Sequence, residues 1–229
     1  MTLIVALLST SVVLTLGLML ALTTTLETDI AANAHGAVQT LALAEAAAER
    51  AAAELGALGT WDDALAGAAT ATFFDGAHGV RQAAGTAIDL DAETAWLLCG
   101  APSCAGQSPD AMTAARPWGS NNPRWTVYAS GTAATLLGPG GRAGPGYVVV
   151  WVGDDAAEND AEPLLDGGAP VAEAGSVENP GLDAVSLRTV AWGPRGSRRE
   201  VELVVERADM VSHTGIRIRV WREVRGALP

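Results

Sequence analysis

Lysine is absent from this chain of 229 residues, and all 14 of its basic side chains are arginines. The glycine-rich run at residues 138–146 therefore lacks the Gly-Lys-Ser/Thr sequence of a phosphate-binding loop, and its composition predicts a linker. The sequence also contains no nucleophile elbow, no zincin motif and no pair of acidic residues spaced for catalysis. These absences predict a protein that is not an enzyme.

Cysteine is scarce, since Cys99 and Cys104 in the segment CGAPSC are the only two. Four residues separate them, whereas catalytic redox pairs are separated by two. A zinc site would need two further ligands, and His35, His78 and His213 have no recognised zinc-binding spacing. In an exported domain the two thiols would oxidise, so we predict a disulfide between them, with free thiols as the alternative.

Charge is missing from residues 1–22, which read MTLIVALLSTSVVLTLGLMLAL. A helix of that length reaches about 33 Å, enough to cross the hydrocarbon core of a bilayer. The hydroxyls of Ser9, Thr10, Ser11 and Thr15 can bond to carbonyls of their own helix, so they do not exclude lipid. The run exceeds the apolar part of a usual signal peptide and has no basic residues before it. We therefore predict a retained membrane anchor, with a cleaved secretory signal as the alternative.

The apolar run continues without a break into an alanine-rich segment at residues 23–55. Apolar side chains recur there at steps of three and four, which predicts an amphipathic helix, and alanine is the best helix former. Gly56 and Gly59 then predict its end. Residues 2–55 should thus form one helix about 80 Å long. Its stripe of small side chains suits close packing on a sheet or on other helices better than a two-stranded coiled coil.

The second half of the chain predicts an antiparallel sheet. Apolar and charged residues alternate at 197–207 and 215–223, so these strands should pair with glutamates opposite arginines and with aligned apolar faces. Further strands are expected at residues 124–129, 147–152 and 184–192, the second of them central because it is apolar throughout. A helix followed by an antiparallel sheet is an α+β fold, in which the alanine stripe covers the apolar sheet face. The aligned apolar side chains are expected to be Val201, Leu203, Val205, Ile216, Ile218 and Val220.

The chain accordingly divides into three parts. Residues 1–22 form the transmembrane part of the helix, residues 23–56 its amphipathic part, and residues 57–229 one globular domain outside the cytoplasm. The formal net charge of −12 is uneven, because residues 23–183 hold 21 acids and five arginines, whereas residues 184–229 hold five acids and nine arginines. An acidic surface repels nucleic acid, so no direct binding to it is expected. The basic C-terminal segment would dock on an acidic neighbour or pair with acids of its own sheet.

Acidic side chains crowd the loop that follows the strand at residues 147–152. Seven oxygen-bearing side chains lie within the 13 residues from 154 to 166, and calcium takes six to eight oxygen ligands. The spacing is not that of an EF-hand, and a solvated acidic loop without a metal is the alternative. No other cofactor is expected. The candidate calcium ligands are Asp154, Asp155, Glu158, Asn159 and Asp160.

The segment WGSNNPRW at residues 118–125 combines two aromatic side chains with a turn and polar groups. Such a combination is typical of a recognition patch, although core packing is the simpler explanation for most of the seven tryptophans. The candidate partner surface consists of Trp118, Asn121, Asn122, Arg124 and Trp125.

The N-terminal region resembles a known family. The sequence TLI at residues 2–4, followed by the apolar run, resembles the mature start of type IV pilins and pseudopilins. The sequences TLE at 25–27, AN at 32–33 and AEAA at 44–47 resemble, in their order and spacing, the N-terminal region of minor pilins of the PilX kind. The resemblance covers about the first 55 residues.

The resemblance implies that the subunit occupies two locations, one before and one after pilus assembly. A prepilin peptidase would remove a leader ending in glycine, and the subunit would wait in the bacterial inner membrane with its domain in the periplasm. The assembly machinery would then join it to other pilins and minor pilins in a pilus at the cell surface. Either Met1 is the first mature residue or it is an encoded start downstream of a leader. The residues expected to pack in the filament are Thr2, Leu3, Ile4, Val5 and Gly17, the last of which lets a neighbouring helix approach closely.

One departure from the family pattern bears on the role of the subunit. Most major pilins have a glutamate at mature position 5, where this chain has Val5 if Met1 is the first mature residue. The departure favours a scarce subunit that initiates or tips a type IV pilus. The alternatives are a minor pseudopilin of a type II secretion system and a membrane-tethered binding module that never enters a filament.

Overall fold

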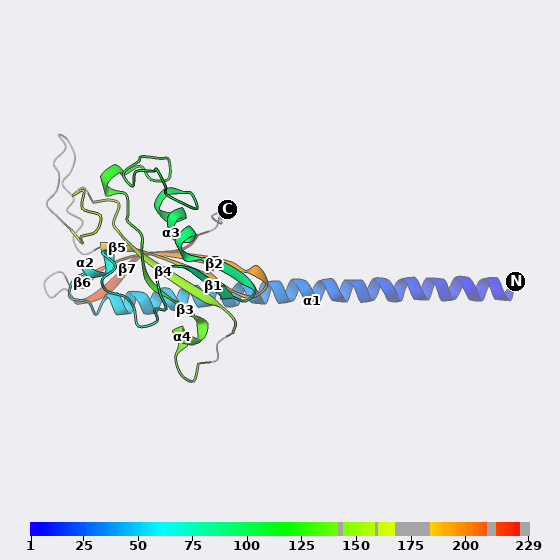
Figure 1. The fold of residues 1–229 in the computed structure, drawn as a ribbon. Helices are drawn as coiled ribbons and strands as arrows, with labels where there is room; N and C mark the ends of the chain where they lie inside the picture. Colours follow the sequence, from blue (N-terminus) through cyan, green and yellow to red (C-terminus); the bar gives the residue numbers. More distant parts are fainter. Residues whose placement is uncertain (142–143, 159, 168–183, 210–213, 225–229) are drawn as a thin grey trace.

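The protein consists of one very long helix and a globular part built on its second half (Figure 1). The computed structural model describes residues 1–141, 144–158, 160–167, 184–209 and 214–224. Helix α1 runs without interruption from Thr2 to Leu55, as the sequence predicts, and ends at Gly56. Its N-terminal half projects from the globular part, and every side chain of residues 1–28 is exposed. The hydroxyls of Ser9, Thr10 and Thr15 donate to carbonyls four residues earlier, as expected.

The C-terminal half of α1 is the buried half. Its alanine stripe lies against one face of a five-stranded sheet, and the core formed there also contains Val150, Leu187 and Leu203. Alanine lets the helix backbone approach the sheet closely, which explains why this stripe carries almost no large side chains. The fully or almost fully buried members of the stripe are Ala44, Ala47, Ala48, Ala51, Ala52 and Leu55.

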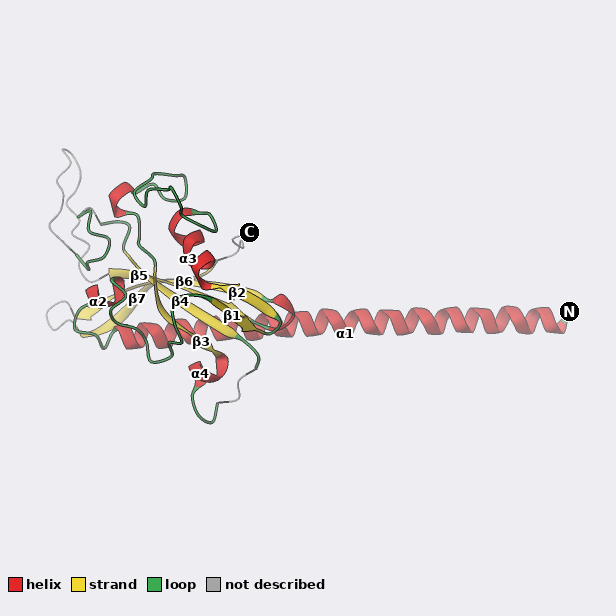
Figure 2. Ribbon diagram, viewed as in Figure 1, coloured by secondary structure: helices red, strands yellow, loops and turns green. Residues whose placement is uncertain are grey.

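The sheet is antiparallel throughout, with the strand order β3-β4-β5-β6-β7 (Figure 2). The α+β layout and all five expected strands are therefore confirmed. Strand β4 lies inside the sheet, between β3 and β5, and is buried at every residue, as its apolar sequence predicts. The middle strand of the five is β5. The strands span Thr126–Thr132 (β3), Tyr147–Asp154 (β4), Ala184–Trp192 (β5), Arg198–Asp209 (β6) and Thr214–Glu223 (β7).

The last two strands pair as expected over part of their length. Glu202 lies opposite Arg222, and Glu206 lies opposite Arg217, each forming an ion pair. Opposite Val204 and Val205 of β6, strand β7 contains a β-bulge that shifts the register by one residue. The residues of β7 after the bulge therefore lie on the opposite face of the sheet from the one that strict alternation predicts. The expectation that Val220 shares the apolar face with Leu203 is therefore wrong. Trp221 is opposite Leu203 instead, and Val220 is opposite Val204.

The other face of the sheet is covered by elements that the sequence did not predict. A hairpin of β1 (Val80–Ala83) and β2 (Thr86–Asp89) leads into α3 (Leu90–Cys99). Asp89 caps α3 by accepting hydrogen bonds from two backbone amides of its first turn. A second core forms between these elements and the odd-numbered residues of β4, and the indole of Trp151 donates to Thr94 of α3 at 2.9 Å. Short helices α2 (Asp62–Leu65), α4 (Ala133–Leu137), η1 (Gly119–Asn121) and η2 (Pro194–Gly196) complete the described fold.

Candidate metal centre

Three carboxylates meet at the end of the buried strand β4. Asp154 is its last residue, and Glu158 and Asp160 follow in the acidic loop. One oxygen from each of the three side chains lies within 4.8 Å of the corresponding oxygens of the other two. All three residues belong to the seven-residue segment 154–160. The three residues are only 4%, 3% and 3% exposed, so this is an internal cluster and differs from a solvated acidic loop.

Local hydrogen bonds fold the loop around this cluster. The amide of Glu158 donates to the carbonyl of Asp155 at 3.0 Å, and the Asp155 side chain accepts from the amide of Ala157 at 3.0 Å. Asp160 Oδ1 accepts from the amide of Glu162 at 3.0 Å. Each bond satisfies a backbone donor within two or three residues, a common use of aspartate in turns.

A residue far away in the sequence closes the loop. The side-chain amide of Asn121 in η1 donates to the carbonyl of Glu158 at 2.8 Å, and its oxygen accepts from the amide of Ala161 at 2.7 Å. Asp62 of α2 holds the far end of the loop by accepting from the amide of Asp166 at 2.8 Å. The loop is therefore fixed from both sides by side chains that no local pattern connects with it.

Apart from a proton that Asp154 and Glu158 can share, the buried oxygens of the cluster have no hydrogen-bond donor in the part of the chain that the structure describes. They are Oδ1 of Asp154, both oxygens of Glu158 and Oδ2 of Asp160. Arg124 and Arg188, which line or flank the neighbouring groove, pair with Asp110 and Glu200 and not with the cluster. Burial, reinforced by the charge of Asp160, raises the pKa of Asp154 to about 8. Burial and the charges of both neighbours raise the pKa of Glu158 to about 10. A buried charge is costly unless it is paired, so Asp154 and Glu158 hold protons when no cation is bound, and a bound cation would displace those protons.

The donor set restricts which cation fits. All the donors are carboxylate oxygens, which suit calcium, magnesium or manganese, whereas zinc and copper favour imidazole and thiolate. Of the predicted ligands, Asp154, Glu158 and Asp160 come together, and Asp155 uses its side chain in the turn described above. Asn159 lies outside the described residues.

The candidate recognition segment is largely engaged inside the fold. Asn122 is fully buried, accepts from the amide of Trp118 at 3.1 Å and donates to two loop carbonyls. Asn121 holds the acidic loop, and Arg124 pairs with Asp110. Trp125 lies flat against Gly153, where a Cβ would meet its ring at 3.0 Å. Trp118 remains 44% exposed.

A groove of about 530 Å³ separates this segment from the outer face of the sheet. Three tryptophans line it, Trp96, Trp118 and Trp125, together with Arg188 and Arg222. The sequence places these residues on four separate elements, so their meeting could not be predicted from any one motif.

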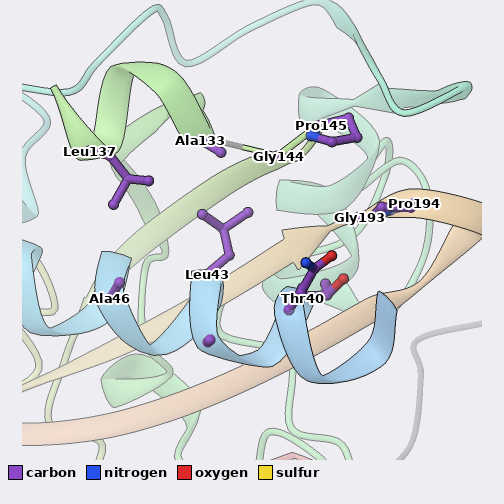
Figure 3. Close-up of a pocket in the computed structure, with 11 residues that line it drawn as sticks. Thr40, Leu43, Ala46, Ala133, Leu137, Gly144, Pro145, Gly193 and Pro194 are labelled. Carbon is purple, nitrogen blue, oxygen red and sulfur yellow. The ribbon is translucent and has the colours of Figure 1, made fainter. Parts of the chain in front are cut away.

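Two other features stand outside this region. A smaller apolar hollow of about 260 Å³ lies between α1, α4 and the β5–β6 connection, lined by Leu43, Leu137 and Pro194 among others (Figure 3).

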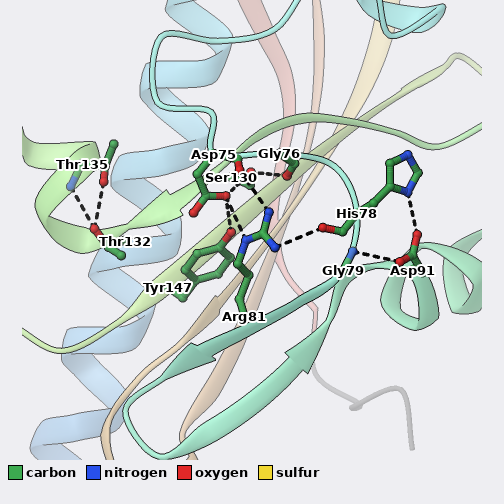
Figure 4. Close-up of polar contacts among 10 residues, drawn as sticks. All are labelled: Asp75, Gly76, His78, Gly79, Arg81, Asp91, Ser130, Thr132, Thr135 and Tyr147. Carbon is green, nitrogen blue, oxygen red and sulfur yellow. Dashed lines mark hydrogen bonds and ion pairs between the residues drawn. The ribbon is translucent and has the colours of Figure 1, made fainter.

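Asp75 accepts hydrogen bonds from Tyr147 at 2.6 Å and Ser130 at 3.0 Å, which ties the first hairpin region to the sheet (Figure 4). Burial and the bond to Asp75 raise the pKa of Tyr147 to about 12.

The remaining predicted residues occupy the expected elements. Cys99 and Cys104 form the predicted disulfide at the end of α3. Thr2, Leu3, Ile4, Val5 and Gly17 all lie on the projecting half of α1, and their side chains are exposed.

Helix α1 is long and apolar enough to cross a membrane by length and composition, and its most apolar stretch is wholly unburied. Comparison with protein-family models, with curated proteins and with solved structures finds no match to this chain.

Proposed function

We propose that this chain is a non-enzymatic subunit of a type IV pilus, of the minor pilin kind, that acts in pilus initiation or at the tip. The observation that carries the proposal is the continuity of α1. One helix of 54 residues is apolar and free of protein contacts in its first half, and packs under a sheet in its second. The transmembrane part would be residues 1–22, the amphipathic part 23–56, and the globular domain 57–229.

The physical argument starts from the exposed apolar surface of the first half. A continuous helical surface of leucine, isoleucine and valine is unstable in water and needs either lipid or other helices around it. A membrane-anchored domain on a flexible tether would meet that need with a helix that stops at the membrane surface. Here the helix does not stop, so its exposed part, residues 1–28 (the rod), and the domain move as one body. Such a body can leave the bilayer and pack its rod against other rods in a filament core.

The domain holds the rod close to the point where the apolar run ends. Arg195 of η2 forms an ion pair with Asp29 at 3.2 Å, and Thr40 shares a hydrogen bond of 2.6 Å with Ser197. The free part of the helix spans residues 1–28, about eight turns, of which the uncharged run of residues 1–22 makes about six. Less than two turns of exposed polar helix, residues 23–28, lie between that run and the first contact with the domain. This arrangement would set the domain directly against a membrane surface before assembly.

The proposed partners follow from that arrangement. A prepilin peptidase and the assembly machinery of the bacterial inner membrane would handle the subunit, and other pilins and minor pilins would surround its rod. If Met1 is the first mature residue, Val5 stands at the position of the usual glutamate, which favours a scarce initiating or tip subunit over a bulk subunit. A minor pseudopilin of a type II secretion system would have the same anchor, and gene neighbourhood separates the two.

A membrane-tethered binding module is the second candidate, and the tryptophan-lined groove beside Trp118 favours it. Deleting the gene and counting surface pili by electron microscopy tests the main proposal. We expect fewer pili, restored when the wild-type gene is returned on a plasmid. Unchanged piliation would overturn the pilus role in favour of the tethered module.

A further inference from the structure

The acidic cluster has a use that the filament role does not require. We propose that Asp154, Glu158 and Asp160 bind one calcium ion, which fastens the acidic loop to the η1 turn and so fixes the wall of the tryptophan-lined groove. The inference rests on the buried cluster and its unpartnered oxygens, and it stands whether or not the chain enters a filament.

The geometry fits a calcium ion. Calcium binds oxygens at 2.3–2.6 Å, so two ligands on opposite sides of the ion are about 4.6–5.2 Å apart. The three carboxylates offer oxygens that all lie within 4.8 Å of one another, which is close enough for all three to contact a single ion. Glu158 offers both of its oxygens, and calcium accepts bidentate carboxylates. Water would complete the six to eight ligands.

Burial supplies the second, independent observation. An acidic surface loop normally points its carboxylates at solvent, yet these three side chains are at least 96% buried. Four of their oxygens are buried with no donor among the described residues other than a proton shared between Asp154 and Glu158. Buried polar groups in folded proteins are nearly always paired, so four orphaned oxygens at one point indicate a missing partner of positive charge. One divalent cation would interact with all four oxygens.

Calcium fits better than its competitors. Magnesium demands near-ideal octahedral geometry at about 2.0–2.1 Å and retains most of its water, so it rarely occupies a site made of three buried carboxylates on one loop. Zinc would favour histidine or cysteine, and the cluster contains neither. The irregular loop geometry and a donor set of carboxylate oxygens are typical of calcium.

The cluster connects directly to the groove. Asn121 binds the backbone on both sides of residue 159, and it sits three residues from Trp118. Trp125 packs against Gly153, next to the ligand Asp154. Asp155 lines the groove itself. Ordering the loop around an ion therefore orders one wall of the groove, and the nearby indoles provide an optical readout.

The test uses the full chain in detergent micelles, stripped of metal with EDTA and then dialysed. Calorimetric titration with CaCl₂ should give one site with a Kd of about 10⁻⁴ M or below, and CaCl₂ should change tryptophan fluorescence at the same concentration. Glu158→Gln and Asp160→Asn should each weaken binding by at least about tenfold, because each removes a charged ligand. Glu162→Gln is the matched control, since it removes the same charge from an exposed side chain of the same loop.

The outcomes are distinct. Binding by the wild type and by Glu162→Gln, with loss in either ligand variant, supports the proposal. Absence of binding at 5 mM CaCl₂ overturns it. Equal weakening in Glu158→Gln and Glu162→Gln also overturns it, because it would indicate diffuse attraction to an acidic surface. Magnesium binding with equal affinity overturns the assignment to calcium. None of these results depends on pilus assembly, so a failure here leaves the filament proposal standing.

Discussion

The seam between α1 and the sheet should tolerate no increase in side-chain size. We predict that Ala48→Leu destabilises the domain, because Ala48 is fully buried in the core that contains Leu187 and Leu203. The substitution inserts three carbon atoms where the helix lies directly on the strands. Overpacking of this kind costs about 1–3 kcal/mol. In a domain of this size each kcal/mol corresponds to about 2–4 °C, so the melting temperature should fall by about 2–12 °C.

The matched control is Ala53→Leu, which lies on the exposed face of the same helix. Leucine and alanine differ little in helix propensity, so this variant should melt within about 1 °C of the wild type. Thermal unfolding of the full chain in micelles, followed by circular dichroism, measures both variants. Equal melting temperatures for Ala48→Leu and Ala53→Leu would refute the reasoning, because the alanine stripe would then not be a close-packed seam.

Three further predictions follow from the described contacts. The chain has two tyrosines, and burial raises the pKa of both Tyr128 and Tyr147 to about 12, so folding favours their neutral forms. The stabilisation that the two neutral side chains provide is complete below about pH 10 and is lost as the pH rises toward 12. Absorbance at 295 nm should therefore show almost no phenolate at about pH 10.5, and phenolate formation near pH 10 would contradict the prediction. Replacing Cys99 and Cys104 together by serine should cost about 2 kcal/mol, seen as a lower melting temperature, and an unchanged value would show that the short ring contributes nothing. Asn121→Ala should lower stability by about 1–3 kcal/mol in denaturant titrations, since two partly buried backbone groups lose their partner. A loss below about 0.5 kcal/mol would argue against the loop closure.

Sequence reasoning succeeded where the signal was long and regular. The helix bounds follow from an uninterrupted apolar and alanine pattern, and strands β4 to β7 follow from apolar runs and strict alternation. The bulge in β7 was not predictable, because Arg219 extends the alternation of the strand and nothing local marks it as the extra residue. The hairpin and α3 were missed since their elements are short and their apolar residues follow no clear period.

The candidate metal centre shows the same limit. Acid density at residues 154–166 predicted a set of ligands, but it could not separate Asp154, Glu158 and Asp160 from Asp155. Burial makes that distinction, and burial depends on Asn121 and Asp62, which lie 37 and 104 residues away from their partners in the loop. Contacts of that range leave no periodic pattern in the sequence. The disulfide was predictable for the opposite reason, because its partners are five residues apart.

The proposed place of this chain in a filament is tested most directly by shearing. Cells expressing the chain with an epitope tag at its C-terminus are sheared, and the released filaments are separated from the cell bodies and immunoblotted. The account predicts that the chain appears with the sheared filaments, in amounts far below those of the bulk subunit. Recovery of the chain solely with the cell membranes, alongside abundant sheared filaments, would contradict it.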